Sequence, residues 1–165
     1  MRKLLVYTCL LFLSVITNAQ ADTANNYVKG FTTIPAFNIN LVPDSSFYSN
    51  GNLLKNKPFM IMFFSPDCDH CQKQTKDILA YKNELKNLQI LMVSVLPNKF
   101  NRPFFEEYKL AAVPNIKLGT DLTYRLRQLY QVKTLPAMYV YDVNGNLAKA
   151  FVGNIDVPAI LNAVK

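Results

Sequence analysis

Apolar and polar positions along the chain predict alternating strands and helices. Residues 58–64 (PFMIMFF) are a continuous apolar run, which is typical of a strand buried on both faces. Residues 88–97 (LQILMVSVLP) are mostly apolar and predict a second buried strand. Between these runs, apolar residues recur at helical spacing, at Ile78, Tyr81, Leu85 and Leu88. We therefore expect a helix from Cys68 to about residue 88. Strand, helix and strand in this order predict a right-handed βαβ unit.

Shorter elements are predicted on either side of this unit. Residues 34–43 alternate well enough for an edge strand, and residues 50–52 carry turn chemistry. Residues 102–110 are typical of a short helix, and residues 115–118 of a short strand. Asp121 can cap a further helix that continues to residue 130.

The end of the chain predicts a hairpin and a last helix. Residues 135–153 favour two strands that turn at Asn144 and Gly145. Asp156 and Pro158 then supply a cap and an early proline for a helix that ends near residue 164. Because the sequence contains neither a linker nor a repeat, we expect one α/β domain with a mixed sheet.

The first residues have a different composition. Arg2 and Lys3 precede an apolar run over residues 4–16, and small residues follow as far as Ala19. This is the pattern of a cleavable secretory signal peptide. The apolar run is too short for a comfortable transmembrane helix.

We therefore divide the chain into three parts. Residues 1–19 are the expected signal peptide, with cleavage after Ala21 as the alternative. Residues 20–33 form a flexible lead-in, and residues 34–165 form the folded domain. The protein is expected to be exported to the periplasm or an equivalent space, with no stable membrane span after cleavage, and to be a monomer.

Export changes the cysteine count and the charge. Cys9 is lost with the signal peptide, so that Cys68 and Cys71 remain for an oxidising compartment. Loss of Arg2 and Lys3 lowers the formal net charge from +7 to +5. The remaining lysines are scattered, which indicates a solvated basic surface. No sequence motif supports a nucleic-acid partner, and such a partner conflicts with export.

The Cys68–Cys71 pair permits three interpretations. A structural zinc site needs four ligands, and the one histidine of the chain, His70, lies inside the same loop. A structural disulfide would close a very short loop and restrain little of the unfolded chain. A dithiol that cycles between reduced and oxidised forms fits a C-x-x-C motif beside a βαβ unit, and we favour it.

The position of each cysteine predicts its role. Cys68 follows a break between strand and helix at residues 65–67, so we expect it in the first helical turn. Free N–H groups and the helix dipole stabilise a thiolate there, and the thiolate is the nucleophile. Cys71 lies one turn further on and can resolve a mixed disulfide on Cys68.

Two segments resemble thioredoxin-like proteins. FFSPDCDHC (residues 63–71) resembles their active-site segment, and residues 130–153 resemble their second half, so that the resemblance covers roughly residues 34–165. It implies a single thioredoxin fold, with a mixed central sheet flanked by helices. It also implies a cis-proline at Pro136 that faces the cysteines, with Leu135 offering backbone groups to a bound peptide. Without the resemblance, a trans proline would be expected.

The resemblance extends to a subgroup, with departures. Extra residues at about 98–121 look like the central insertion of TlpA/ResA-like exported thioredoxins and of AhpC/TSA peroxiredoxins, and export favours the former. Met62 and Gln74 stand where these families often carry acids, so neither residue can accept the Cys71 proton. The tryptophan that usually precedes the motif is missing, because the chain has no Trp.

Three charged or titratable residues surround the pair. His70 resembles the loop histidine of DsbA-like oxidants and is expected to stabilise the Cys68 thiolate, unless it is only an exposed loop residue. Asp67 and Asp69 act in the opposite direction, so the loop does not decide the direction of electron flow. Asp67, Asp69 or a water remain candidates for the proton acceptor.

The resulting hypothesis is an exported thiol–disulfide oxidoreductase. It would exchange disulfides with protein partners, be reset by a redox partner, and need no metal or organic cofactor. One alternative is an AhpC/TSA-type thiol peroxidase, for which Ser65 is available. The other is a Sco-like copper carrier, although that family uses a wider cysteine spacing and a later histidine.

Overall fold

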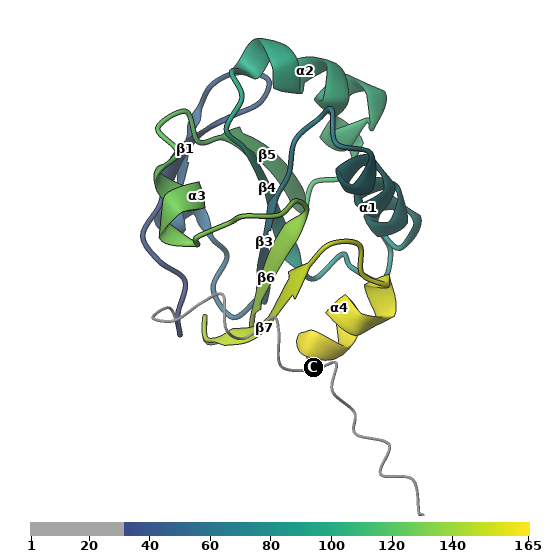
Figure 1. The fold of residues 1–165 in the computed structure, drawn as a ribbon. Helices are drawn as coiled ribbons and strands as arrows, with labels where there is room; N and C mark the ends of the chain where they lie inside the picture. Colours follow the sequence, from purple (N-terminus) through teal and green to yellow (C-terminus); the bar gives the residue numbers. More distant parts are fainter. Residues whose placement is uncertain (1–31) are drawn as a thin grey trace, which may run out of the picture.

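The computed structural model describes residues 32–165, which form a seven-stranded sheet with helices on both faces (Figure 1). The strands are β1 (Asn38–Leu41), β2 (Phe47–Ser49), β3 (Phe59–Phe63), β4 (Gln89–Ser94), β5 (Ile116–Thr120), β6 (Ala137–Tyr141) and β7 (Leu147–Val152). The helices are α1 (Asp69–Ala80), α2 (Asn98–Glu107), α3 (Arg125–Leu129) and α4 (Val157–Ala163), with 3-10 turns η2 (Asn50–Asn52) and η3 (Leu110–Ala112).

The sheet is mixed, with strand order β2-β1-β5-β4-β3-β6-β7. β4 pairs in parallel with both β3 and β5, whereas β6 runs antiparallel to β3. The carboxyl ends of β3, β4 and β5 therefore lie at one edge of the sheet. The amino end of β6 lies at the same edge.

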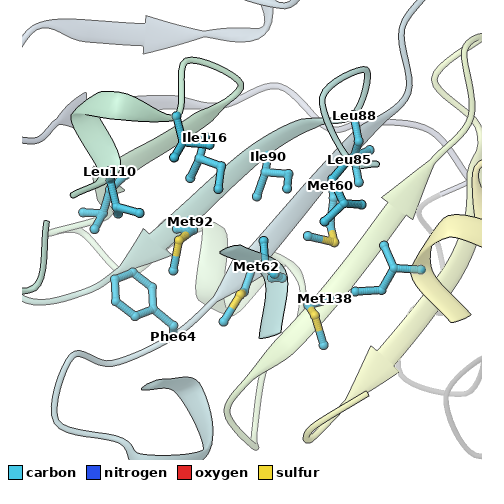
Figure 2. Close-up of a cluster of buried hydrophobic side chains, with 14 of the residues drawn as sticks. Met60, Met62, Phe64, Leu85, Leu88, Ile90, Met92, Leu110, Ile116 and Met138 are labelled. Carbon is cyan, nitrogen blue, oxygen red and sulfur yellow. The ribbon is translucent and has the colours of Figure 1, made fainter. Parts of the chain in front are cut away.

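Both faces of the central strands are buried, as the continuous apolar runs predict. Phe59, Ile61 and Phe63 of β3 point into one core, which α3 covers through Leu126. The alternate residues of β3 point into the other core, which α1, α2 and α4 cover. Figure 2 shows that this second core is rich in methionine, at Met60, Met62, Met92 and Met138.

The βαβ prediction is confirmed, but the helix is shorter than its spacing suggests. α1 ends at Ala80, and residues 81–87 form turns. The apolar spacing persists because Leu85 and Leu88 are buried from the turns rather than from a helix. At the other end, Cys68 is the N-cap residue with an extended backbone, so the expectation that it lies in the first turn is wrong.

The expectation of an edge strand over residues 34–43 is also wrong. β1 pairs with β2 on one side and with β5 on the other, so β2 is the edge strand. Phe47 of β2 is largely exposed, so the pattern of apolar and polar residues does not reveal this strand. The turn chemistry at residues 50–52 appears as η2.

The extra segment at residues 98–121 completes the sheet. It contains α2, η3 and β5, and β5 joins the β1–β2 pair to β4. α2 begins at Asn98, four residues before the predicted start, with Pro103 inside the helix. The short strand predicted at residues 115–118 is present as β5.

The last third of the chain follows its predicted order. The Asp121 carboxylate accepts the N–H groups of Arg125, Leu126 and Arg127, and thereby starts α3. β6 and β7 form the hairpin, in which Gly145 takes a positive φ of 80° at the turn. α4 follows Asp156 as its N-cap residue, although no side-chain cap bond forms.

The predicted signal peptide, residues 1–19, lies outside the described residues, as does most of the lead-in. The two described residues of the lead-in bond to the hairpin. Thr33 pairs with Asn146, and the Thr32 carbonyl accepts the Leu147 N–H at 2.7 Å. Within residues 32–165, no helix combines the length and apolarity that a membrane crossing requires.

Candidate active site

Cys68 lies where β3 gives way to α1. β3 ends at Phe63, residues 66 and 67 form a turn, and the Cys68 N–H donates to the Ser65 carbonyl at 3.2 Å. The Cys68 sulfur accepts the backbone N–H of Cys71 at 3.3 Å, so a sulfur occupies the position that a capping oxygen usually takes. An N–H of the first helical turn therefore points directly at this sulfur.

The two cysteines differ in exposure. Both are free thiols, Cys68 is half-buried, and Cys71 has an exposed fraction of 0%. Burial raises the pKa of Cys71 to about 12, and its hydrogen bond to Cys68 and the charges of Cys68 and Asp67 act in the same direction. Cys71 therefore stays protonated at neutral pH, and a reagent in solution reaches Cys68 first.

His70 is held by a residue that the sequence did not single out. Its Nδ1 lies 2.9 Å from Asn154 Oδ1, and the Asn154 amide nitrogen donates to the His70 carbonyl at 2.7 Å. The ring is exposed. The only available signal in the sequence was an amide directly after Gly153, at the end of the predicted hairpin.

Gln74 forms a second amide contact one turn further along α1. Its Oε1 accepts the Ile155 N–H at 2.8 Å, and its Nε2 donates to the Ile155 carbonyl at 3.1 Å. The Gln74 side chain is fully buried, and both ends of its amide are used. Gln74 and Asn154 together fasten the segment between β7 and α4 to the start of α1.

The two acids of the loop have different surroundings. Asp67 and Asp69 are both exposed, and the Ser65 hydroxyl donates to the Asp67 carboxylate. Asp69 is the first residue of α1, where a negative charge is favourable. Of the two, only Asp67 contributes to the raised pKa of Cys71.

Leu135 and Pro136 lie at the same edge as the cysteines. β6 pairs with β3 so that Ala137 faces Phe63, which places the residues before Ala137 beside the end of β3. The Leu135–Pro136 bond is cis, and the Pro136 carbonyl accepts the Gly153 N–H at 2.8 Å. Leu135 and Cys68 both pack against the core that contains Cys71.

Across residues 32–165, histidine, cysteine and acidic side chains do not gather in groups of three or more that could hold a metal ion.

Comparisons with known proteins identify the fold and the family. The thioredoxin-like domain family matches residues 52–165. No curated protein matches the chain.

Three solved structures are similar over most of their length. A thioredoxin-type protein from Neisseria meningitidis has 24% identity and a TM-score of 0.66, over 80% of this chain and 87% of that one. The exposed lipoprotein thioredoxin Etrx1 of Streptococcus pneumoniae has 23% identity and a TM-score of 0.60, over 78% and 96%. Peroxidoxin BcpB of Mycobacterium tuberculosis has 14% identity and a TM-score of 0.67, over 79% and 92%.

These structural similarities show the fold, and the family match is independent of them. The fold and the family support an oxidoreductase. With the matched region covering α1, the whole βαβ unit and the final hairpin, the chain belongs to the thioredoxin-like domain family.

Proposed function

We propose that the protein is an exported thiol–disulfide oxidoreductase of the TlpA/ResA-like kind, which exchanges disulfides with protein partners. The observation that carries the proposal is the asymmetry of the pair. Cys68 is half-buried at the start of α1 and receives an N–H bond, whereas Cys71 is fully buried with a raised pKa. This is the arrangement that an attacking thiol and a resolving thiol need.

The two cysteines supply both electrons of the reaction. The Cys68 thiolate attacks one sulfur of a partner disulfide, forms a mixed disulfide and releases the first partner thiolate, which takes up a proton. Cys71 then loses its proton and attacks the Cys68 sulfur. This step releases the second partner thiol and leaves a Cys68–Cys71 disulfide. Two electrons have moved to the partner, and the reverse sequence oxidises a partner dithiol.

The second step requires a proton acceptor near Cys71. Gln74 cannot serve, because its neutral amide is not a base. Both ends of this amide are also bonded to Ile155. Asp67 is the better of the two loop acids, since its charge acts on the Cys71 thiol. We therefore assign Asp67 as the acceptor, with Ser65 holding its carboxylate.

Partner binding is assigned to the edge that carries the cysteines. Leu135 lies there, directly before Pro136, and would offer backbone groups to an extended peptide of the partner. His70, held by Asn154, would tune the Cys68 thiolate. Export to the periplasm or an equivalent space rests on the sequence of residues 1–19.

The direct test is disulfide reduction by the reduced protein, with insulin as the substrate. Cys68→Ala and Cys71→Ala should each abolish turnover. In addition, Cys71→Ala should accumulate mixed disulfides on Cys68, because the resolving thiol is absent. Mass spectrometry of the trapped adducts identifies the cysteine that carries them. Adducts on Cys71 in Cys68→Ala, with none on Cys68 in Cys71→Ala, would reverse the assignment. Turnover by Cys68→Ala would refute the mechanism.

A thiol peroxidase remains the alternative enzyme, since peroxidoxin BcpB shares the fold. Within the described residues, the Ser65 hydroxyl bonds to Asp67 and is not directed to Cys68 by a hydrogen bond. Peroxide consumption at a rate comparable with insulin reduction would favour this alternative. Tight retention of Cu(I) by the reduced protein would favour the copper carrier.

A further inference from the structure

A basic hollow lies at the edge of the sheet opposite the cysteines. Its volume is about 210 Å³. Lys57 precedes β3, Lys86 precedes β4, and Lys117 lies near the start of β5, so the hollow lies at the amino ends of the parallel strands. Cys68 follows the carboxyl end of β3. A ligand in the hollow would therefore leave the redox edge free.

The hollow presents hydrogen-bond donors that have no acceptor. No carboxylate is among its lining residues. In the described chain, the ammonium groups of Lys57, Lys86 and Lys117 form no hydrogen bond or ion pair. The Asn87 amide and the Tyr48 hydroxyl, which also line it, are likewise unpaired among residues 32–165. Three positive charges without counter-charges favour an anionic ligand.

The frame of the hollow is fixed by other side chains. The Gln89 amide accepts the Leu54 N–H at 2.6 Å and donates to the Leu54 carbonyl at 3.1 Å. The Asn115 amide nitrogen donates to the carbonyls of Leu85 and Leu88, each at 3.0 Å. These bonds hold together the segments that carry the lysines. The donors are therefore presented by an ordered rim.

We propose that this basic hollow binds the phosphate group of a phosphate monoester. Such a group carries close to two negative charges and three strong acceptor oxygens, which match the set of unpaired donors. The volume is below that of ordinary small-molecule pockets, about 300–1,000 Å³, so the hollow fits a head group and not a whole nucleotide.

A second hollow adjoins the first and suggests where the rest of the ligand would lie. Its volume is about 190 Å³, and it shares Pro114 and Lys117 with the basic hollow. Apolar side chains line much of it, among them Val42, Leu110, Val113 and Leu118. The phosphate could therefore belong to a soluble ester or to a lipid head group, and the experiment must separate these two sources.

Binding is tested with glycerol phosphate in calorimetry and with phosphatidic acid vesicles in co-sedimentation. Glycerol, which lacks the phosphate, is the control for glycerol phosphate. Vesicles of phosphatidylcholine, whose head group has no net charge, are the control for phosphatidic acid vesicles. The test variant replaces Lys57, Lys86 and Lys117 by Gln. A matched variant replaces Lys76, Lys109 and Lys149 by Gln as well. These lysines lie outside both hollows, and the variant loses the same charge as the test variant.

We expect saturable binding that weakens by at least about tenfold in the first variant and by less than about twofold in the matched variant. Binding of glycerol phosphate identifies a soluble ester, and binding of vesicles alone identifies a lipid head group. Absence of saturable binding to both probes overturns the proposal. Equal losses in the two variants also overturn it, because they indicate general attraction to a basic surface. Insulin reduction should be unchanged in both variants, which confirms that they fold.

Discussion

Asn154 fixes the orientation and the tautomer of His70. The amide nitrogen of Asn154 donates to the His70 carbonyl at 2.7 Å, and a carbonyl can only accept. Its Oδ1 therefore faces the ring, and Nδ1 must carry the hydrogen that it donates across 2.9 Å. The ring is left with Nε2 as its free atom. A residue 84 positions away along the chain thus determines which side of the imidazole can act.

Asn154→Ala removes both of these hydrogen bonds. Each is worth about 0.5–1.5 kcal/mol, so the free energy of unfolding should fall by about 1–3 kcal/mol. His70→Ala removes only the side-chain bond and should cost less. Urea denaturation measures both changes. Asn162→Ala, which removes one exposed bond to Lys165, is the control, and a loss no larger than in this control would contradict the assigned role of Asn154.

His70→Ala should also make the reduction potential of the pair more negative. A cationic ring would stabilise the Cys68 thiolate and thereby the reduced form. About 1.4 kcal/mol corresponds to about 30 mV, and an exposed charge is screened, so the change should be tens of millivolts at most. It should be larger at acidic pH, where an imidazole is charged, than at alkaline pH. Equilibration with glutathione at two pH values measures the reduction potentials of His70→Ala and of the parent protein. Equal potentials would mean that His70 is an ordinary loop residue without effect on the pair.

The parts of this fold that the sequence predicts are those with local causes. The runs over residues 58–64 and 88–97 predict buried strands because nearly every position is apolar, and β3 and β4 are indeed buried on both faces. Asn144 and Gly145 predict the hairpin because the turn needs a positive φ, which Gly145 takes. The C-x-x-C spacing and the break before it likewise place both thiols at the start of α1.

The parts that the sequence misses depend on distant partners. Asn154 and Gln74 act through contacts 84 and 81 positions apart, which no periodicity reveals. β2 is a three-residue edge strand whose first residue is exposed, and its pairing with β1 replaces the expected edge. The apolar spacing beyond Ala80 predicted a longer helix. This prediction failed because turns bury Leu85 and Leu88 as well as a helix would, so the spacing does not distinguish the two.

Asp67→Asn separates two roles of this carboxylate in the second chemical step. The charge of Asp67 raises the pKa of Cys71, so its removal alone should make Cys71 ionise more readily and should speed resolution. If Asp67 accepts the proton, its loss should instead slow resolution by about 10²-fold or more. We expect the slower reaction. Stopped-flow measurement of partner release from a preformed mixed disulfide on Cys68 reports the rate.

Asp69→Asn is the matched control for this measurement. It removes the same charge from the neighbouring exposed position, without the bond to Ser65 that Asp67 has. Its rate of resolution should stay close to that of the parent protein. A rate for Asp67→Asn that is equal to or faster than the parent's would exclude Asp67 as the acceptor.

Gln74→Glu should make stability depend on pH at a buried site. The amide donates to the Ile155 carbonyl, and a carboxyl group can do so only when it is protonated. Burial and this bond should therefore raise the folded-state pKa of the new carboxyl group above its unfolded value of about 4.3. Its stabilising contribution is then complete below about pH 4 and is lost as the pH rises through the folded value.

At neutral pH this variant should be less stable than the parent by about 1–3 kcal/mol, and the difference should narrow in acid. Urea denaturation at several pH values tests the trend. Gln74→Met fills a similar volume without a titrating group and should show a difference that does not vary with pH. A pH-independent loss for Gln74→Glu would mean that Ile155 finds another donor.

Three buried tyrosines should make the fold sensitive to alkali. The hydroxyls of Tyr130 and Tyr141 are 2.7 Å apart, and the Tyr139 hydroxyl donates to the Tyr130 carbonyl at 3.3 Å. Burial raises the pKa of Tyr139 and of Tyr141 to about 12 and raises the pKa of Tyr130 as well. Each value is above the ordinary value of 10.0, so the folded state holds its protons longer than the unfolded state. The stabilising contribution is complete below about pH 10 and is lost as the pH rises toward 12 and beyond. Each group can contribute a slope of about 1.4 kcal/mol per pH unit.

Tyr141→Phe should therefore cost about 1 kcal/mol at neutral pH, through the lost hydrogen bond, and should show a shallower loss of stability above pH 10. Denaturant unfolding from neutral pH to about pH 11, followed together with tyrosinate absorbance, measures both effects. The exposed Tyr124 offers the control Tyr124→Phe, which should leave the alkaline slope unchanged. The same slope in Tyr141→Phe as in the parent would show that the alkaline sensitivity has another origin.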